Sequence, residues 1–227
     1  MAVLVKICGI TNVGDALAAL GAGADFLGFV LVPGTPRQVT PVQAAAIIRE
    51  IRARAAVERA VPPRMVGVFQ DAPEAEIRAA VAECGFDVIQ LHGEEPDALV
   101  QGLGPDRVWK MLPLRTPQDV ARALAHPAAA VLADAVRGAQ RGGTGAVCDW
   151  ELAATVARQR RLVLAGGLTP ENIAAAVAQV RPWAVDVGSG VEATKGKKDH
   201  AKIQALIQAV RRAAWPNSWG WTSPRCG

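Results

Sequence analysis

Short runs of apolar residues recur along the chain and alternate with longer segments whose apolar positions repeat every three or four residues. The short runs are typical of buried β-strands, and the longer segments are typical of helices that bury one face. We expect strands at residues 3–10, 25–32, 64–70, 87–93, 107–114, 129–135, 161–166 and 184–188.

Helical spacing is clearest in four stripes of apolar residues between these runs. They consist of Ala44, Ile47, Ile48 and Ile51; Ile77, Ala80, Val81 and Cys84; Ile173, Ala176, Val177 and Val180; and Ile203, Leu206, Ile207 and Val210. Thr-Pro pairs at 40–41, 116–117 and 169–170 combine an N-cap residue with proline at the first helical position, so they predict helix starts. Glycines at 21, 23, 85, 102 and 104 are expected to end helices.

Strict alternation of strands and helices predicts an α/β protein with a parallel sheet and the helices outside it. Eight such units within 227 residues favour closure into a single-domain (β/α)8 TIM barrel. A doubly wound open sheet is the alternative. No linker or break in composition suggests a second domain, so we assign residues 1–213 to the barrel and 214–227 to a Trp-rich C-terminal tail.

Composition narrows the class of protein. Hydrophobic residues make up 51% of the chain and charged residues 20%, which excludes a disordered chain. The net charge is +4, but the basic residues are scattered over presumed helix surfaces, so we expect no nucleic-acid partner. The N-terminus enters a strand directly, and the apolar runs are too short to cross a bilayer. We therefore expect no signal peptide and no membrane partner.

The cysteines lack the spacing of metal ligands and fall in different units. We therefore expect reduced thiols in a cytoplasmic protein, and no metal site. Cys84 lies on an apolar stripe and is expected in the core. Cys148 and Cys226 have no neighbouring group that suggests catalysis.

Several expected strands carry polar residues on one face near their C-terminal ends. Lys6 and Cys8, for example, alternate with apolar residues of the same strand. In a barrel, one parity of each strand faces the lumen, and barrel enzymes place their sites at the C-terminal mouth. The polar residues expected to face inward are Lys6, Cys8, Gln90, His92, Lys110, Asp134 and Asp186.

Glycine turns follow the last three expected strands, at 142–145, 166–167 and 188–190. Glycine allows backbone N–H groups to approach an anion closely, and a following helix start adds its dipole. A single glycine turn is often only a cap. Three of them at neighbouring strand ends favour a phosphorylated ligand.

Motifs that carry a family resemblance extend over almost the whole chain up to residue 213. They comprise Lys6-Ile-Cys-Gly-Ile-Thr11, Pro36-Arg37, Gln90-Leu-His-Gly93, Asp134 with Gly142-Gly-Thr-Gly145, Ala165-Gly-Gly-Leu-Thr-Pro-Glu-Asn172, and Asp186-Val-Gly-Ser-Gly-Val-Glu192 with Gly196-Lys-Lys-Asp199. In this combination the sequence resembles the phosphoribosylanthranilate isomerase family of L-tryptophan biosynthesis. Two features depart from the family pattern: Gly188 stands where serine is frequent, and the loop around Arg37 lacks the usual aromatic or serine character.

The resemblance implies an intramolecular aldose–ketose isomerase that performs an Amadori rearrangement. N-(5-phosphoribosyl)anthranilate becomes 1-(2-carboxyphenylamino)-1-deoxyribulose 5-phosphate. The ribose ring must open, which needs an acid at the ring oxygen, and the resulting Schiff base must lose its C2 proton to a base. The resemblance further implies a small-molecule phosphoribosyl substrate, no metal and no cofactor. We expect a monomer or a homodimer.

The same resemblance implies that Cys8 is the general base and Asp134 the general acid. We expect the Lys6 ammonium, on the same strand face, to favour the thiolate of Cys8. The alternative for Cys8 is a small buried residue of the core. The alternative for Asp134 is a loop carboxylate paired with Arg137 or Arg141.

Further residues are expected to bind the substrate. Arg37 would bind the anthranilate carboxylate through its planar guanidinium, unless it is only a solvated loop arginine. Asp186 would hold the ribose hydroxyls or the amine, and Gln90 and His92 would contact or shape the substrate. The phosphate would lie against Gly143, Thr144, Gly145, Gly166, Gly167, Gly188, Ser189 and Gly190, with Lys197 and Lys198 either adding positive charge or simply solvated.

Two other functions stay open. The barrel isomerase of histidine biosynthesis runs the same chemistry on a larger bisphosphate, but it has aspartates in both catalytic positions, where this chain has Cys8 in one. The first half of this chain also lacks a matching glycine-rich phosphate turn. A non-catalytic phosphosugar-binding barrel that regulates a partner is the second alternative, although it would not need both Cys8 and Asp134.

Overall fold

The computed structural model describes residues 2–59, 61–134, 136–137, 140–141 and 149–213. Eight parallel strands close into a barrel in the order β1-β10-β9-β6-β5-β4-β3-β2, which confirms the predicted (β/α)8 barrel and excludes an open sheet. The strands are β1 (Leu4–Cys8), β2 (Phe26–Val30), β3 (Arg64–Phe69), β4 (Val88–Leu91), β5 (Val108–Met111), β6 (Ala130–Ala133), β9 (Leu162–Leu164) and β10 (Ala184–Val187).

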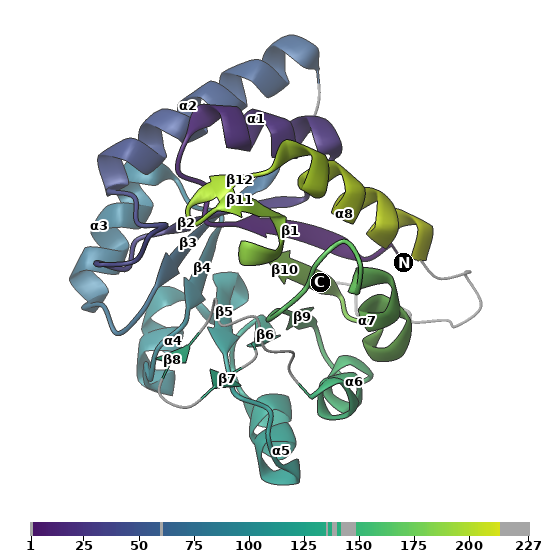
Figure 1. Cartoon of the computed structure of the whole chain (residues 1–227). Coiled ribbons are helices and arrows are strands. Elements are labelled where there is room, and N and C mark those ends of the chain that lie inside the picture. Colours follow the sequence, from purple (N-terminus) through teal and green to yellow (C-terminus); the bar gives the residue numbers. More distant parts are fainter. Residues whose placement is uncertain (1, 60, 135, 138–139, 142–148, 214–227) are drawn as a thin grey trace.

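Helices surround the ring of strands, as Figure 1 shows. Their apolar stripes are buried against it: Ile47, Ile48 and Ile51, for instance, are at most 5% exposed. The helices are α1 (Val13–Ala22), α2 (Pro41–Glu58), α3 (Glu74–Cys84), α4 (Asp97–Leu103), α5 (Pro117–Ala125), α6 (Trp150–Ala157), α7 (Ile173–Val180) and α8 (His200–Ala213), with short 3₁₀ turns η1 (Pro105–Arg107) and η2 (Ser189–Val191).

Two of the three expected Thr-Pro helix starts are confirmed. Thr40 and Thr116 each form a capping box and are followed by proline. The third was wrong, because α7 begins at Ile173 and not after Thr169. Asn172 explains the difference: its Oδ1 accepts from Thr169 N at 2.8 Å, and its Nδ2 donates to Gly167 O at 2.8 Å. The second of these bonds ties Asn172 back to the preceding glycine turn, and Asn172 is the residue directly before the helix.

A small hairpin, β11 (Glu192–Thr194) with β12 (Lys197–Lys198), connects the end of the barrel to α8. The start of α1 fixes it in place. Asp15 Oδ2 accepts from the backbone N of Lys198 at 2.9 Å, and Thr11 Oγ1 donates to Gly196 O at 2.8 Å. The hairpin is therefore held against the C-terminal end of β1. A second short pair, β7 (Val136–Arg137) with β8 (Gln140–Arg141), follows β6.

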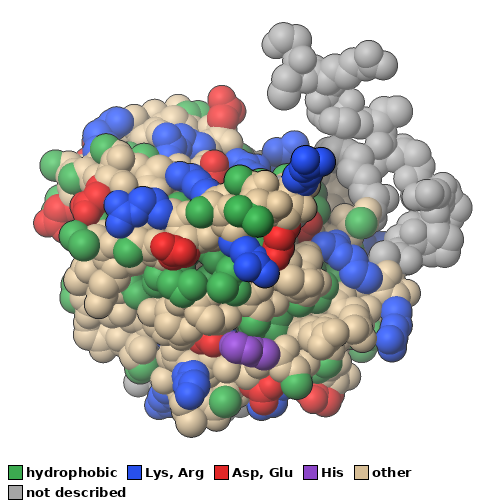
Figure 2. All heavy atoms as spheres, turned by 90° about the horizontal axis from the view of Figure 1, so that it is seen from above, with side chains coloured by type: hydrophobic (Ala, Val, Ile, Leu, Met, Phe, Trp, Pro, Cys, Tyr) green, Lys and Arg blue, Asp and Glu red, His purple; other side chains and the backbone are tan. Residues whose placement is uncertain are grey.

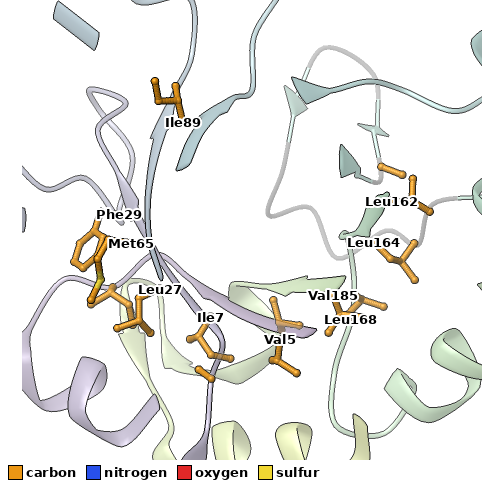
Figure 3. Close-up of a cluster of buried hydrophobic side chains, with 14 of the residues drawn as sticks. Val5, Ile7, Leu27, Phe29, Met65, Ile89, Leu162, Leu164, Leu168 and Val185 are labelled. Atoms are coloured by element: carbon orange, nitrogen blue, oxygen red, sulfur yellow. The ribbon is translucent and has the colours of Figure 1, made fainter. Parts of the chain in front are cut away.

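The larger part of the core lies between the outer face of the barrel and the helices. Alternate residues of the strands contribute most of its strand side. Figure 3 shows part of this layer, where Val5 and Ile7 of β1, Leu27 of β2 and Val185 of β10 leave the barrel wall on its outer side. Alternation therefore sends Leu4, Lys6 and Cys8 of β1 to the lumen.

The lumen itself is filled by a second, smaller cluster that includes Phe26, Trp109 and Met111. The rings of Phe26 and Trp109 meet edge to face, with centroids 4.9 Å apart. This packing corrects one prediction, because Lys110 does not face the lumen. Its neighbours on β5 do, so Lys110 points outward, where its Nζ donates to Gly93 O at 2.6 Å and to Glu95 Oε2 at 2.7 Å.

The surface shows no single charged stripe on the face in Figure 2, where lysine and arginine side chains lie among aspartate and glutamate. No helix in the described part of the chain is both long and apolar enough to span a membrane. The proposed tail at 214–227, Cys148 and Cys226 lie outside the described residues, so those expectations stay predictions.

Candidate active site

A cavity of about 280 Å³ lies at the C-terminal ends of the barrel strands. It brings together side chains that are far apart in the sequence and that were all expected at the site: Cys8, Arg37, Gln90, His92, Asp134 and Asp186. These six residues bring one thiol, one guanidinium, two carboxyls, one amide and one imidazole to the mouth of the barrel. It also places the thiol at the end of β1 and Asp134 after β6, on separate walls of one cavity.

A buried ion pair lies beneath this cavity. Lys6 of β1 and Asp186 of β10 are register partners, and Lys6 Nζ donates to both carboxylate oxygens of Asp186 at 2.9 Å. Burial by itself lowers the Lys6 pKa, but Asp186 and the nearby Cys8 outweigh it, so the pKa is raised and the side chain stays a cation. Asp186 lines the cavity as expected, with Lys6 as its fixed partner.

The thiol of Cys8 is not biased toward the thiolate in the way the sequence suggested. Burial raises the pKa of Cys8, and although the Lys6 ammonium lowers it, Asp186 raises it again, so the pKa lies above its ordinary value. Lys6 does lower the pKa of Cys8, as expected. The overall pKa is nevertheless raised, so the expected bias toward the thiolate is wrong for the site as a whole. The physical reason is burial, which disfavours the charged thiolate more than Lys6 favours it, and Asp186 adds to the effect of burial.

Gly28 of β2 shapes the space around these groups. A Cβ at this position would lie 2.8 Å from Lys6 Nζ and 2.9 Å from Cys8 Sγ, closer than van der Waals contact allows. Gly28 is the register partner of Cys8, so its missing side chain leaves room for the lysine and the thiol together. This role of Gly28 was not predicted, because a glycine inside an apolar strand gives no sign of what faces it.

On the other side of the cavity, three polar groups form a row. Gln90 Nε2 lies 3.2 Å from His92 Nδ1, and His92 Nε2 lies 3.3 Å from Asp134 Oδ2. With the amide donating to Nδ1, the proton of the neutral imidazole is on Nε2, toward Asp134. Asp134 is 8% exposed and borders the cavity. The side chains of Arg137 and Arg141 are not among those described, so pairing with them is not tested.

Arg37 reaches the cavity from the loop after β2 and is held at its tip by Glu192. Its Nε and Nη2 donate to Glu192 Oε1 and Oε2 at 2.7 and 2.8 Å. Lys198 Nζ donates to the same Oε1 at 3.1 Å and to Gly188 O at 2.9 Å. The hydrogen bonds that Arg37 donates to Glu192 raise the pKa of Arg37, and burial lowers the pKa of Lys198 although Glu192 opposes that shift. Lys198 is thus buried, while Lys197 is exposed.

Glu192 was not predicted as a site residue. Its partner Arg37 is 155 positions away, and the pair forms only because the hairpin folds back over the start of α1. Glu192 did stand at the end of a quoted motif, next to the glycine turn after the last strand. An acidic residue so close to a turn expected to bind an anion is unusual, and this proximity is the sequence feature that could have indicated Glu192.

Two glycine turns border the cavity where a phosphate was expected. Gly166 and Gly167 have φ of +85° and +62°, which favours glycine. The Gly188-Ser189-Gly190 turn lies against them, because a Cβ on Gly190 would collide with Leu168 O at 1.8 Å. Both turns line the cavity. Gly143, Thr144 and Gly145 lie outside the described residues, so their expected part in phosphate binding stays a prediction.

No group of three or more His, Cys, Asp or Glu side chains within the described ranges is arranged to hold a metal ion. Cys84 is 3% exposed within the helix-facing core, as predicted. A second cavity of about 320 Å³ lies beside Glu95, Lys110 and His126. The buried Lys110 in its wall is already paired with Glu95.

Comparison with known proteins identifies the same family that the sequence motifs resemble. The sequence model of the "N-(5'phosphoribosyl)anthranilate (PRA) isomerase" family matches residues 5–209. A relative of that name from Pelobacter propionicus is 46% identical over 209 residues, which cover 91% of this chain and 95% of the relative.

Solved structures agree. The dimeric phosphoribosylanthranilate isomerase from Thermotoga maritima, studied as monomers generated from it, superimposes with a TM-score of 0.79 at 38% identity, covering 92% of this chain and 99% of that one. A phosphoribosylanthranilate isomerase in complex with reduced 1-(o-carboxyphenylamino)-1-deoxyribulose 5-phosphate superimposes with a TM-score of 0.78 at 37% identity, with coverage of 92% and 99%. From its first strand to its last helix, the chain belongs to the N-(5'-phosphoribosyl)anthranilate isomerase family.

Proposed function

We propose that this chain catalyses the Amadori rearrangement of N-(5-phosphoribosyl)anthranilate to 1-(2-carboxyphenylamino)-1-deoxyribulose 5-phosphate in L-tryptophan biosynthesis. The observation that carries the proposal is the cavity itself. A thiol and a carboxyl, the two groups needed to move protons, face one space from the ends of β1 and β6. A guanidinium and two glycine turns border the same space, and they match the carboxylate and the phosphate of this substrate.

The substrate's two anionic ends fix its orientation. The phosphate lies against the turns at Gly166-Gly167 and Gly188-Ser189-Gly190, where backbone amides can approach it closely. The carboxylate of the aryl ring meets Arg37. With both ends held, the ribose ring lies between Cys8 and Asp134, and the bound geometry supplies much of the rate enhancement.

Asp134 acts first, as general acid. It gives its proton to the ring oxygen of the ribose as the bond from that oxygen to C1 breaks, and the nitrogen lone pair forms the C=N bond of the protonated Schiff base. His92 lies 3.3 Å from one oxygen of Asp134, so the other oxygen is the one that donates to the sugar. Gln90 orients the imidazole in turn.

Cys8 acts second, as general base. Its thiolate takes the proton from C2, and the electron pair of that C–H bond moves toward the iminium nitrogen to give an enolamine. The enolamine then tautomerises to the C2 ketone of the product. The raised pKa of Cys8 makes the thiolate the scarcer form at neutral pH and also the stronger base once formed.

The proposed setting is the cytoplasm, and the chain is proposed to act as a monomer or a homodimer. The relative from Thermotoga maritima, described as dimeric, supports the second of these states. Gel filtration of the purified chain at micromolar concentration decides between them.

One progress curve tests the proposed function. Phosphoribosylanthranilate is generated in place by a phosphoribosyltransferase that joins anthranilate to phosphoribosyl pyrophosphate with release of pyrophosphate. It is mixed with the purified chain, and the fluorescence of the aminobenzoate group is followed. We expect an enzyme-dependent loss of fluorescence far above the background decay. A rate indistinguishable from that without enzyme, from folded protein, contradicts the proposal. The bisphosphate substrate of the histidine pathway, tested in parallel, shows whether the activity belongs to that reaction instead.

A further inference from the structure

Glu192 binds one edge of the Arg37 guanidinium and so determines which edge remains available to another ligand. The contact is side-on: Nε and Nη2 each donate to one oxygen of the same carboxylate, at 2.7 and 2.8 Å. A guanidinium has five N–H donors in a rigid plane, so this bidentate bond also sets the plane and direction of the rest of the group. Nη1 and the second proton of Nη2 make no hydrogen bond within the described part of the chain.

Those uncommitted donors form the end-on edge of the guanidinium, which has the geometry to bind a second carboxylate. Arg37 lines the catalytic cavity, and its side chain is 20% exposed. The aliphatic stem is held from the other side: a Cβ on Gly9 would lie 2.6 Å from Arg37 Cδ. Gly9 directly follows Cys8, so the stem of the arginine crosses the chain at the residue after the thiol.

Glu192 itself is held in turn. It begins the hairpin β11–β12, and its Oε1 also accepts from the buried Lys198 at 3.1 Å. The charge of the carboxylate is therefore shared between two cations, and Arg37 keeps positive charge for an additional anion. Burial alone would raise the pKa of Glu192, but the hydrogen bonds and charges of Arg37 and Lys198 lower it. The carboxylate of Glu192 is therefore stabilised in its ionised form.

We propose that Glu192 is a positioning residue that holds the end-on edge of Arg37 toward the cavity, and thereby makes the enzyme selective for substrates whose aryl ring carries a carboxylate. This inference rests on the proposed function, in which Arg37 meets the carboxylate of the anthranilate ring. Glu192 does not touch the substrate. It removes the rotational freedom of a long side chain before binding, so that less is lost when the substrate carboxylate arrives.

The test compares two inhibitors that differ only in that carboxylate. One is the reduced product analogue 1-(2-carboxyphenylamino)-1-deoxyribitol 5-phosphate, and the other is the same molecule with a plain phenyl ring. For Glu192→Gln, we expect the Kd of the first to rise about ten- to hundredfold, the range set by loss of a well-oriented charge-assisted hydrogen bond. The Kd of the phenyl compound should stay within about twofold of the parent.

Three further variants separate positioning from general damage. Glu192→Asp keeps the charge but is one methylene too short to bind Arg37 and Lys198 together, so it should show the same selective loss, and it replaces Glu192→Gln if that variant does not fold. Lys198→Met keeps the Arg37–Glu192 contact and loosens the Gly188 turn, so it should weaken both inhibitors alike. In an Arg37→Ala background, Glu192→Gln should add no further loss for the carboxylate compound.

Three results contradict the inference. Equal weakening of both inhibitors by each folded Glu192 variant shows that the residue only supports the hairpin. No change with either inhibitor shows that Arg37 needs no positioning. Additive losses in the Arg37→Ala background show that Glu192 acts by another route. Failure of the proposed function looks different, because the parent chain would then bind neither inhibitor and turn over no substrate.

Discussion

Replacing Gly28 by alanine tests whether the thiol and the lysine are packed as tightly as the structure indicates. The added Cβ would sit 2.8 Å from Lys6 Nζ and 2.9 Å from Cys8 Sγ. Ordinary contacts between such heavy atoms are about 3.5–4.0 Å, so the neighbours must move by roughly 0.5–1 Å. Lys6 is held by two hydrogen bonds of 2.9 Å to Asp186 and is fully buried, which leaves it little freedom to yield.

Most of the displacement should therefore fall on the half-buried Cys8, whose thiol borders the cavity. A misplacement of about 1 Å at a reacting group costs up to about a hundredfold in rate, so we expect kcat to fall about ten- to hundredfold. Overpacking of this kind also lowers the free energy of unfolding by about 1–3 kcal/mol. The variant should thus remain folded at 25 °C while losing most of its activity.

The assay is steady-state turnover followed by fluorescence, with thermal unfolding measured on the same samples. Gly21→Ala is the matched control, because a Cβ at that position in α1 meets no atom within 4 Å. It should keep the parent kcat and, as an alanine in a helix, raise the stability by up to about 1 kcal/mol. If Gly28→Ala keeps the parent kcat and the parent rate of alkylation of Cys8, the lysine and the thiol are not packed as tightly as described.

Other predictions concern the protons and the tail. Cys8→Ser should lower kcat about 10²–10⁴-fold, as expected for loss of a general base, and near-parent turnover by the folded variant would make the thiol a packing residue. Asp134→Asn should stall ring opening while the product analogue still binds within a few-fold, and a Kd weakened as much as kcat would show a binding role instead. Because burial raises the pKa of Cys8 and only the thiolate is alkylated by iodoacetamide, the rate of alkylation of Cys8 should still be rising with pH above about pH 8.5, the ordinary thiol pKa; a plateau reached below neutral pH is the contrary result. Ending the chain after residue 214 should leave kcat/KM within a few-fold, unless the tail contributes to the site.

The parts of the fold that were predictable are those encoded by local periodicity. Alternation in β1 correctly separated Lys6 and Cys8 from Val5 and Ile7, and the Thr-Pro signals at 40–41 and 116–117 correctly marked helix starts. The same alternation failed at β5, since it cannot say which parity faces the lumen. Tertiary packing determines the parity of β5. Trp109 packs against Phe26 inside the barrel, and Lys110 binds Glu95 outside it.

The site was predictable as a set of residues but not as a set of contacts. Cys8, Arg37, Gln90, His92, Asp134 and Asp186 all reach one cavity, because strand ends in a parallel barrel meet at one mouth. Glu192 and Gly28 were missed, since their importance comes from partners distant in sequence. The same is true of the Cys8 pKa, which depends on burial and on the Lys6–Asp186 pair that no spacing reveals.

The Lys6–Asp186 pair has a consequence for how the site comes into being. It joins residues 180 positions apart, across the seam where the first strand of the barrel meets the last. A chain emerging from the ribosome folds from its N-terminus, so Lys6 has no carboxylate at this register until β10 has been synthesised. The cation beside the thiol therefore becomes fixed only when the ring closes. Assembly of the proposed catalytic base is in this way tied to the final step of folding, and we expect chains that stop before β10 to be inactive.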